Sequence, residues 1–301
     1  MDDRGHLLTE TRNPRSAHFD RLSIAQAFEL MNDEDARVVA AVRQVKPEVC
    51  AAIEMVSDAL ASGGRLIYVG AGTSGRLGVL DASECPPTFL SDPSMVRGII
   101  AGGWDALRMA VEGAEDHPAD GAQAVDEMGV GARDVVFGIT TGGTTPFVHG
   151  ALKRAHDCGA KTILLSCVSA DHLPKLADVA IHVLVGPEVV TGSTRLKAGT
   201  ATKMILNMVT TIAMTRLGKV YQNLMVDVNT KANAKLVDRG VRIIQAVTGV
   251  DRATGGKLLE AADGHVKTAL VMHIKKVNRA EAERLLTQSG GRVGAILQPV
   301  Q

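Results

Sequence analysis

The feature that most constrains this chain is a series of short β-rich runs separated by segments of helical period. The runs lie at residues 66–69, 96–100, 135–139, 162–166 and 179–184, with helix-length stretches such as 105–114 and 147–157 between them. Strands that alternate with helices favour parallel βαβ units with right-handed crossovers. The pattern predicts the α/β class, with a doubly wound, mainly parallel five-stranded sheet and helices on both faces.

The two ends of the chain follow other patterns. Residues 1–30 are polar and irregular, and the acidic run NDED at 32–35 predicts the start of a long helix to about Leu60, because acids favour the N-terminal end of a helix dipole. From Thr191 onward the pattern is entirely helical, beginning with a helix at 198–217. We therefore expect an N-terminal segment and helix at 1–45, a central α/β domain at 46–238, and a small all-helical module at 239–301.

Composition excludes several classes of protein. Equal numbers of basic and acidic residues, 33 of each, argue against a nucleic-acid binder, and 46% hydrophobic residues argue against a disordered regulator. The N-terminus has no basic region followed by an apolar stretch, and no long apolar run occurs, so we expect a cytoplasmic protein that does not contact membranes. Cysteines and histidines are dispersed without metal-ligand spacing, and we expect no metal.

A glycine-rich loop follows the first expected strand. Residues 70–76 read GAGTSGR, which matches the dinucleotide fingerprint GxGxxG, but the second strand ends in IIAGG instead of the acidic residue that holds a ribose. The hydroxyls of Thr73 and Ser74, beside Gly72 and a helix start, instead suit a single phosphate monoester. A glycine-rich turn with capping hydroxyls and no ligand is the alternative interpretation.

Two more polar loops follow later strands. The run TTGGTTP at 140–146 contains Thr141, Thr144 and Thr145 before a proline at a helix start, and TGSTR at 191–195 contains Ser193 and Thr194. Open parallel sheets place their ligands at the carboxyl ends of strands. The three loops together predict a sugar phosphate, whose many hydroxyls need polar partners.

Two carboxylates are candidates for proton transfer. Glu84 precedes two prolines, which we expect to end any helix and to leave Glu84 at an irregular, accessible edge. Glu112 and Glu115 are three residues apart at the end of an expected short helix, where the dipole and Asp116 would disfavour the ionised form. Solvated surface acids are the alternative, so the residues alone support a sugar-phosphate binder with acid/base chemistry.

Several motifs resemble one family. They are GAGTSGRLG at 70–78, DASECPPT at 81–88, AVEGAED at 110–116, GPEVVTGSTR at 186–195 and NLMVD at 223–227. These runs are similar to those of the N-acetylmuramic acid 6-phosphate etherases. The resemblance extends over nearly the full chain, because it includes TETRNP at 9–14, NDED at 32–35 and the C-terminal helical module.

The resemblance implies a sugar isomerase (SIS) fold, a ubiquitin-associated-like helical region, a homodimer and no cofactor. It also implies a lyase that cleaves the D-lactyl ether of N-acetylmuramic acid 6-phosphate, giving N-acetylglucosamine 6-phosphate and D-lactate during cell-wall recycling. By motif, the family's proton donor falls on Glu84 and its second catalytic glutamate on Glu115, which we interpret as the base. Thr73, Ser74 and the second loop are expected to hold the 6-phosphate, and Ser193 and Thr194 to complete the pocket.

One loop departs from the family pattern. Where these etherases usually have SGRTP, residues 142–146 read GGTTP, so Gly142 and Thr144 replace a serine and an arginine. Backbone N–H groups and the threonine hydroxyls at 141, 144 and 145 would compensate, with altered affinity or substrate preference. Two alternatives stay open: an aldose–ketose isomerase on the same fold, and a non-catalytic sugar-phosphate sensor such as the related glucokinase regulatory protein.

Overall fold

The computed structural model describes residues 5–231 and 234–297, and the chain forms two compact units. The first unit comprises Met1–Ala82 and Ser94–Thr210, and the second comprises Ser83–Pro93 and Thr211–Gln301. Two helices, α3 (Gly72–Phe89) and α6 (Lys197–Arg216), each contribute residues to both units. The division expected at 1–45, 46–238 and 239–301 stays a prediction.

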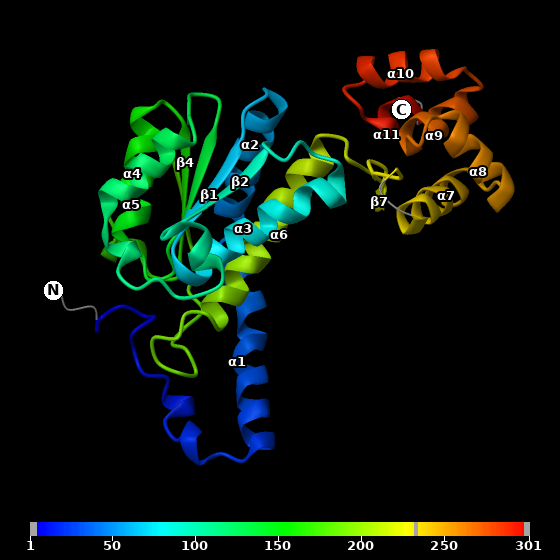
Figure 1. The fold of residues 1–301 in the computed structure, drawn as a ribbon. Helices are drawn as coiled ribbons and strands as arrows, with labels where there is room; N and C mark the ends of the chain where they lie inside the picture. Colours follow the sequence, from blue (N-terminus) through cyan, green and yellow to red (C-terminus); the bar gives the residue numbers. More distant parts are fainter. Residues whose placement is uncertain (1–4, 232–233, 298–301) are drawn as a thin grey trace. The chain divides into compact units, whose positions relative to one another are not determined.

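A five-stranded parallel sheet forms the centre of the first unit (Figure 1). Its strands are β1 (Leu66–Gly70), β2 (Val96–Ile100), β3 (Val135–Ile139), β4 (Lys161–Ser166) and β5 (Val179–His182). They lie in the order β2-β1-β3-β4-β5, and every neighbouring pair is parallel. The predicted five-stranded sheet is therefore confirmed, and the order reverses beside β1, where doubly wound sheets bind ligands.

Helices cover both faces of this sheet (Figure 1). On one face, α4 (Pro118–Glu127) and α5 (Pro146–Asp157) pack against strand side chains such as Ile67 and Val136. The other face carries α2 (Lys46–Ala61) and α3 (Gly72–Phe89). Because both faces are covered, every residue of β1 and β3 is buried, which explains their continuous apolar sequence.

The N-terminal helix begins earlier than the sequence pattern predicts. Ser23 is the N-cap of helix α1 (Ile24–Gln44). Its hydroxyl accepts a hydrogen bond from the Gln26 N–H, and the Gln26 side chain accepts one from the Ser23 N–H. This reciprocal capping box places the acidic run at 32–35 within α1, so the predicted helix start there is wrong. The single long helix expected to about Leu60 is also wrong, because a separate helix, α2, begins at Lys46.

The segment after β2 differs from prediction as well. Residues 105–114 do not form an α-helix; the chain makes two short 3₁₀ helices, η3 (Gly103–Leu107) and η4 (Ala114–Asp116). Each follows a glycine in the left-handed conformation, Gly102 with φ 82° and Gly113 with φ 77°, and such residues interrupt a right-handed helix. Glu112 and Glu115 therefore do not share a helix face, and the helix-dipole argument for Glu115 fails.

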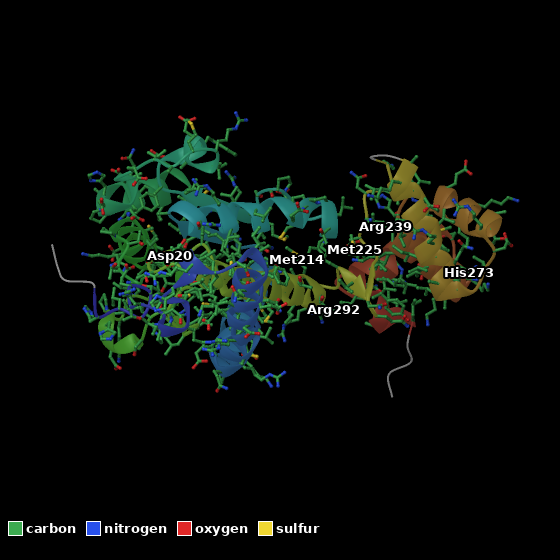
Figure 2. All side chains as sticks on the ribbon, turned by 90° about the horizontal axis from the view of Figure 1, so that it is seen from below. Asp20, Met214, Met225, Arg239, His273 and Arg292 are labelled. Carbon is green, nitrogen blue, oxygen red and sulfur yellow. The ribbon has the colours of Figure 1, made fainter. Side chains whose placement is uncertain are left out.

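The second unit contains the expected C-terminal helices. They are α7 (Ala234–Thr248), α8 (Arg252–Ala261), α9 (Val266–Lys275), α10 (Arg279–Gln288) and α11 (Val293–Leu297). Side chains such as Val241, Ile244 and Leu270 form a core of their own, which confirms the predicted all-helical module. Figure 2 labels side chains of this unit, including Met225, which lies in a short hairpin that the sequence pattern did not predict.

That feature is a small antiparallel hairpin before the module. Strands β6 (Val220–Tyr221) and β7 (Leu224–Met225) pair across a turn in which Gln222 has φ 56°. The expectation of purely helical structure after Thr191 is therefore wrong at this point. Among the helices of the described ranges, none is long and apolar enough to cross a membrane.

Candidate functional site

The glycine-rich loop brings the end of β1 close to the start of α3. A Cβ atom on Gly70 would lie 2.6 Å from the Gly75 nitrogen, and one on Gly75 would lie 2.6 Å from Ile100 Cγ1. Gly72 differs, because it has φ +52° and no neighbouring atom within 4 Å of a built Cβ. Two glycines thus permit close strand–helix packing, while Gly72 turns the chain and leaves open space before the helix.

The first turn of α3 presents backbone donors to that space. The Gly75 N–H donates to the Ala71 carbonyl at 3.3 Å, but within residues 5–231 and 234–297 no group accepts a hydrogen bond from the backbone N–H of Gly72, Thr73 or Ser74. Such a helix start, with its partial positive charge, suits an oxyanion. The geometry fits the phosphate site predicted at Gly72, Thr73 and Ser74, although binding there remains a prediction.

The second loop joins β3 to α5. Thr145 precedes Pro146 at the start of α5, and its hydroxyl lies 2.8 Å from that of Thr140. Thr141 and Thr144 are half-buried, and neither hydroxyl is hydrogen-bonded to any residue of the described ranges. Of the three predicted phosphate ligands in this loop, Thr141 and Thr144 therefore have free hydroxyls, while Thr145 is already engaged.

The third loop precedes α6 (Lys197–Arg216), and a side chain of the protein itself accepts hydrogen bonds from the first N–H groups of this helix. The buried Glu188 carboxylate accepts hydrogen bonds from the N–H groups of Lys197 at 3.0 Å and Ala198 at 2.9 Å. Burial raises the pKa of Glu188, and these two bonds only partly offset it. The sequence pattern did not distinguish this helix start, which has its own carboxylate, from that of α3.

The first and third loops meet beside Gly199 of α6. A Cβ on Gly199 would lie 3.5 Å from the Thr194 carbonyl oxygen and 3.6 Å from Thr73 Cγ2. Ser193 and Thr194 are both half-buried in this loop. The structure therefore brings Thr194 near Thr73, two of the residues that the sequence placed in one pocket.

A second link holds α3 beside α6 within the first unit. Asp81 of α3 is buried, accepts a hydrogen bond from the Tyr68 hydroxyl at 3.0 Å, and lies 3.5 Å from Lys203 Nζ. Asp81 belongs to the DASECPPT motif, whose spacing predicted no role for this residue. Its position suggests that part of this motif holds the two helices together.

The N-terminal segment connects the second and third loops, a connection that the sequence pattern did not predict. The Thr9 carbonyl accepts a hydrogen bond from the Gly192 N–H at 3.2 Å, and Thr9 Oγ1 is 3.9 Å from a Cβ built on Gly142. Glu10 Oε2 lies 3.2 Å from a Cβ built on Gly192. Contacts through Thr9 thus join loops that are far apart in the sequence.

A buried ionic network anchors that segment. Glu34 on α1 is 1% exposed and accepts hydrogen bonds from Lys197 Nζ at 2.5 Å, Arg15 Nη1 at 2.6 Å and Asn13 Nδ2 at 2.9 Å. Burial acts to raise the pKa of Glu34, but the three donors and the Lys197 charge outweigh it, and the pKa lies below its ordinary value. Asn13 also donates to the Pro187 carbonyl. The network therefore ties the N-terminal segment to the start of α6.

The sequence held a weak signal for this network. Glu34 lies four residues before Val38 and eight before Val42, so it shares a helix face with two buried apolar residues. Its pairing with Lys197, far away in the chain, had no local signal.

Glu84 lies within a helix, not at an irregular edge. Helix α3 runs through Pro86 and Pro87 to Phe89, so the expectation that the prolines end it is wrong. A proline ring holds a helical φ and removes one N–H donor, which this last stretch of α3 tolerates. The Glu84 side chain is exposed, as expected, and belongs to the Ser83–Pro93 segment of the second unit.

Glu115 lines a cavity of about 150 Å³ in the first unit. Its walls include Gly72 and Arg76 of α3 and both Glu112 and Glu115; the rest are small or aliphatic residues, Ala71, Ala101, Ala106, Ala110, Val111, Gly113 and Ala114. Arg76 Nη2 donates to the Met109 carbonyl at 3.1 Å. The cavity therefore joins a candidate base to the helix start that suits a phosphate.

No metal centre is evident in the part of the chain that the structure describes. No three His, Cys, Asp or Glu side chains in these ranges are grouped so that they could hold an ion. Within these ranges no disulfide joins Cys50, Cys85, Cys158 or Cys167.

Comparisons with known proteins identify the class to which this fold and site belong. Residues 48–156 match the model of the glucokinase regulatory protein N-terminal SIS domain. A putative phosphosugar isomerase from Bacteroides fragilis, 19% identical, has a TM-score of 0.51 and covers 67% of this chain and 95% of its own. A phosphoheptose isomerase from Neisseria gonorrhoeae, 17% identical, has a TM-score of 0.50 and covers 64% of this chain and 100% of its own. The first unit thus has a SIS fold.

Curated relatives narrow the class to one family. N-acetylmuramic acid 6-phosphate etherase from Crocosphaera subtropica is 50% identical, with coverage of 100% of this chain and 98% of the relative. The protein of the same name from Synechococcus elongatus is 53% identical, with coverage of 98% and 96%. The chain belongs to the N-acetylmuramic acid 6-phosphate etherase family, which confirms the resemblance drawn from the motifs.

Proposed function

We propose that this chain is a carbon–oxygen lyase that cleaves the D-lactyl ether of N-acetylmuramic acid 6-phosphate, releasing N-acetylglucosamine 6-phosphate and D-lactate. Full-length similarity to etherases at 50% and 53% identity supports the assignment. The structural observation that carries it is the cavity lined by both Gly72 and Glu115, which sets a candidate base beside the free N–H groups of α3.

The chemistry follows from the open-chain form of the sugar. The C1 aldehyde acidifies the proton on C2, and the lactyl ether oxygen is bonded to the adjacent C3. Glu115 removes the C2 proton, the C3–O bond breaks as the family's proton donor, which the motif assigns to Glu84, protonates the departing lactate oxygen, and a C2=C3 double bond forms. Water then adds its hydroxyl at C3 and a proton at C2. The steps balance as hydrolysis of an ether, and each proton transfer contributes about 10²–10⁴-fold.

The phosphate at C6 binds at the polar loops in this proposal. The N–H groups of Thr73 and Ser74 and their hydroxyls hold its oxygens, with free hydroxyls from Thr141 and Thr144 as further donors. Thr145, Ser193 and Thr194 complete the polar wall. Thr144 stands where the family pattern usually has an arginine, so backbone donors take a larger share of the binding.

The test is release of D-lactate from N-acetylmuramic acid 6-phosphate in heavy water. We expect product with deuterium at C2, and loss of turnover by about 10²-fold or more in Glu84→Gln and Glu115→Gln, both folded normally. Glu112→Gln is the matched control, because Glu112 lines the same cavity and has no assigned role. Absence of D-lactate from the wild-type protein would sink the proposal; loss of turnover in Glu112→Gln alone would transfer the base role to Glu112.

A non-catalytic sensor is the second candidate, and the match to a regulatory protein's SIS domain favours it. A sensor binds the sugar phosphate without turnover, and Glu84→Ala then leaves its output intact. An isomerase, the other alternative, exchanges the C2 proton but releases no lactate. The lactate assay in heavy water separates all three.

We further propose that the chain acts as a homodimer in the cytoplasm, in cell-wall recycling. Helix α1 supports the dimer, because Ile24 is 92% and Phe28 65% exposed, and both lie with the exposed Val39 on one side of the helix. Light scattering on the wild type and on Ile24→Lys/Phe28→Lys tests it. A monomeric wild type, or a variant that remains a dimer, removes this interface.

A further inference from the structure

We propose that Arg76 binds the lactyl carboxylate of the substrate and thereby determines specificity for the lactyl ether. This inference rests on the function proposed above and names the residue that separates this substrate from other sugar phosphates. A phosphate group is common to every substrate of a sugar-phosphate enzyme. The lactyl carboxylate is a second anion, and a guanidinium is well suited to bind it.

Arg76 has donors available for such an anion. It follows the glycine-rich loop on α3 and is half-buried in the wall of the 150 Å³ cavity. Its only hydrogen bond within the described ranges goes from Nη2 to the Met109 carbonyl at 3.1 Å. A guanidinium has five N–H donors, so most of them remain free for a ligand.

The charge of Arg76 is also unpaired. Glu112 and Glu115 line the same cavity, yet in the described part of the chain no carboxylate lies within ion-pair distance of this guanidinium. Among the described residues that line the cavity, Arg76 is the only cation. Two carboxylates repel an incoming anion, and a cation between ligand and base offsets that repulsion.

The position of the base decides which anion Arg76 meets. Glu115 must reach C2, and the lactyl ether leaves from the neighbouring C3, whereas the phosphate on C6 lies at the far end of the open chain. Arg76 shares its small cavity with Glu115, so a substrate whose C2 meets Glu115 has its lactyl group within reach of the guanidinium. The phosphate is held by the backbone N–H groups and hydroxyls of Thr73 and Ser74 in the function proposed above, which leaves the guanidinium to the second anion. The planar fork of arginine matches a carboxylate with two parallel hydrogen bonds, which lysine cannot do.

The experiment compares two substrates in two proteins. One substrate is N-acetylmuramic acid 6-phosphate, and the other is its lactamide analogue, which has the same shape but no carboxylate charge. We expect Arg76→Gln to lower kcat/KM for the acid by about 10- to 100-fold, chiefly through KM, and to leave the lactamide nearly unaffected. Arg76→Lys keeps the charge without the fork and should fall between the two.

Two controls exclude other roles for Arg76. Arg108→Gln removes a nearby exposed arginine that does not line the cavity, and its kinetics should match the wild type. Inorganic phosphate, used as a competitive inhibitor, should bind Arg76→Gln as well as it binds the wild type. Thermal melts of each variant check folding.

Each outcome decides the proposal. Equal losses on the acid and the lactamide would show a structural role, and weaker inhibition by inorganic phosphate would place Arg76 at the phosphate; either result overturns the inference while lactate release by the wild type leaves the proposed function standing. A wild type that releases no D-lactate overturns both. Selective loss on the acid supports both.

Discussion

Helices α3 and α6 begin close together, beside Thr73 and Gly199, but their first backbone N–H groups have different partners. At α6, the N–H groups of Lys197 and Ala198 donate to the Glu188 carboxylate. At α3, nothing in the described ranges accepts from the N–H groups of Thr73 or Ser74. Both starts follow polar, glycine-containing loops, so the sequence pattern is similar. A helix start stays available to a ligand only where the chain supplies no carboxylate of its own.

The largest expected effect on stability comes from removing the Lys197 charge from the buried ionic network around Glu34. In Lys197→Met, Glu34 keeps Arg15 and Asn13 but loses its buried cation, so we expect the free energy of unfolding to fall by about 3–5 kcal/mol. Urea denaturation measures it. Glu34→Gln combined with Lys197→Met should recover much of the loss, because no buried charge then lacks its partner. Lys203→Met, at a more exposed lysine, is the control; an equally large loss there would contradict this account.

A smaller effect is expected from crowding the start of α3. Gly75→Ala places a Cβ 2.6 Å from Ile100 Cγ1 and 2.7 Å from the Gly70 carbonyl oxygen, so the strand and helix must separate. We expect about 1–3 kcal/mol of destabilisation in urea, with weaker binding of inorganic phosphate. Gly256→Ala in α8 is the matched control, since its Cβ meets no atom within 4 Å, and it should be neutral or slightly stabilising. A Gly75→Ala protein as stable as the wild type would remove the packing argument.

We expect the Thr73 hydroxyl on α3 to contribute more to substrate binding than the Thr200 hydroxyl on α6. Thr73→Ala removes a proposed phosphate donor, and we expect KM to rise roughly fivefold, which corresponds to about 1 kcal/mol. Thr200→Ala on α6 removes a hydroxyl that donates to the Leu196 carbonyl, and it should leave KM unchanged. Steady-state lactate release measures both. A larger KM effect at Thr200 than at Thr73 would reverse the comparison.

The smallest expected effect is a pH dependence of stability at Glu188, which accepts hydrogen bonds from the first N–H groups of α6. The pKa of Glu188 in the folded protein is raised above its ordinary value of 4.5 by burial, so its protonated form stabilises the fold. That contribution is fully present below pH 4.5 and is lost as pH rises through the folded pKa. The difference in unfolding free energy between the wild type and Glu188→Gln should therefore shrink as pH rises above 4.5 in urea titrations.

Glu34→Gln provides the opposite case. The pKa of Glu34 is lowered in the folded protein, so its contribution to stability is present above its ordinary pKa of 4.5 and is lost as pH falls through the folded pKa. The difference in unfolding free energy between wild type and variant should therefore change with pH in opposite directions for Glu34→Gln and Glu188→Gln. Slopes of the same sign would contradict the assigned directions.

Local patterns predicted the strands well and some helix boundaries poorly. Each of the five strands coincides with an expected β-rich run, because a continuous apolar run is what burial on both faces requires. The helix start at the acidic run failed, since the Ser23 capping box lies earlier in the chain. The expected helix at 105–114 failed because the chain forms two short 3₁₀ helices there, each after a left-handed glycine, and helical period alone does not report φ.

The candidate site was predicted in the same uneven way. The three polar loops and both glutamates were found from residue type and motif, but Arg76, Glu188 and the Glu34–Lys197 pair were not. The motif GAGTSGR contains Arg76, yet nothing local shows that its guanidinium lacks an ion-pair partner. Pairing across long stretches of chain is invisible to period and composition.

The amino-acid sequence by itself determined the parallel sheet, the polar loops at its carboxyl edge and the family, because these depend on local pattern and short motifs. Only the tertiary structure decided which helix start is open. That property depends on where a distant carboxylate lies: Glu188 reaches the first N–H groups of α6, while no described group reaches those of α3. Hydrogen bonds form across space, so the availability of a donor follows from the folded arrangement of the whole unit.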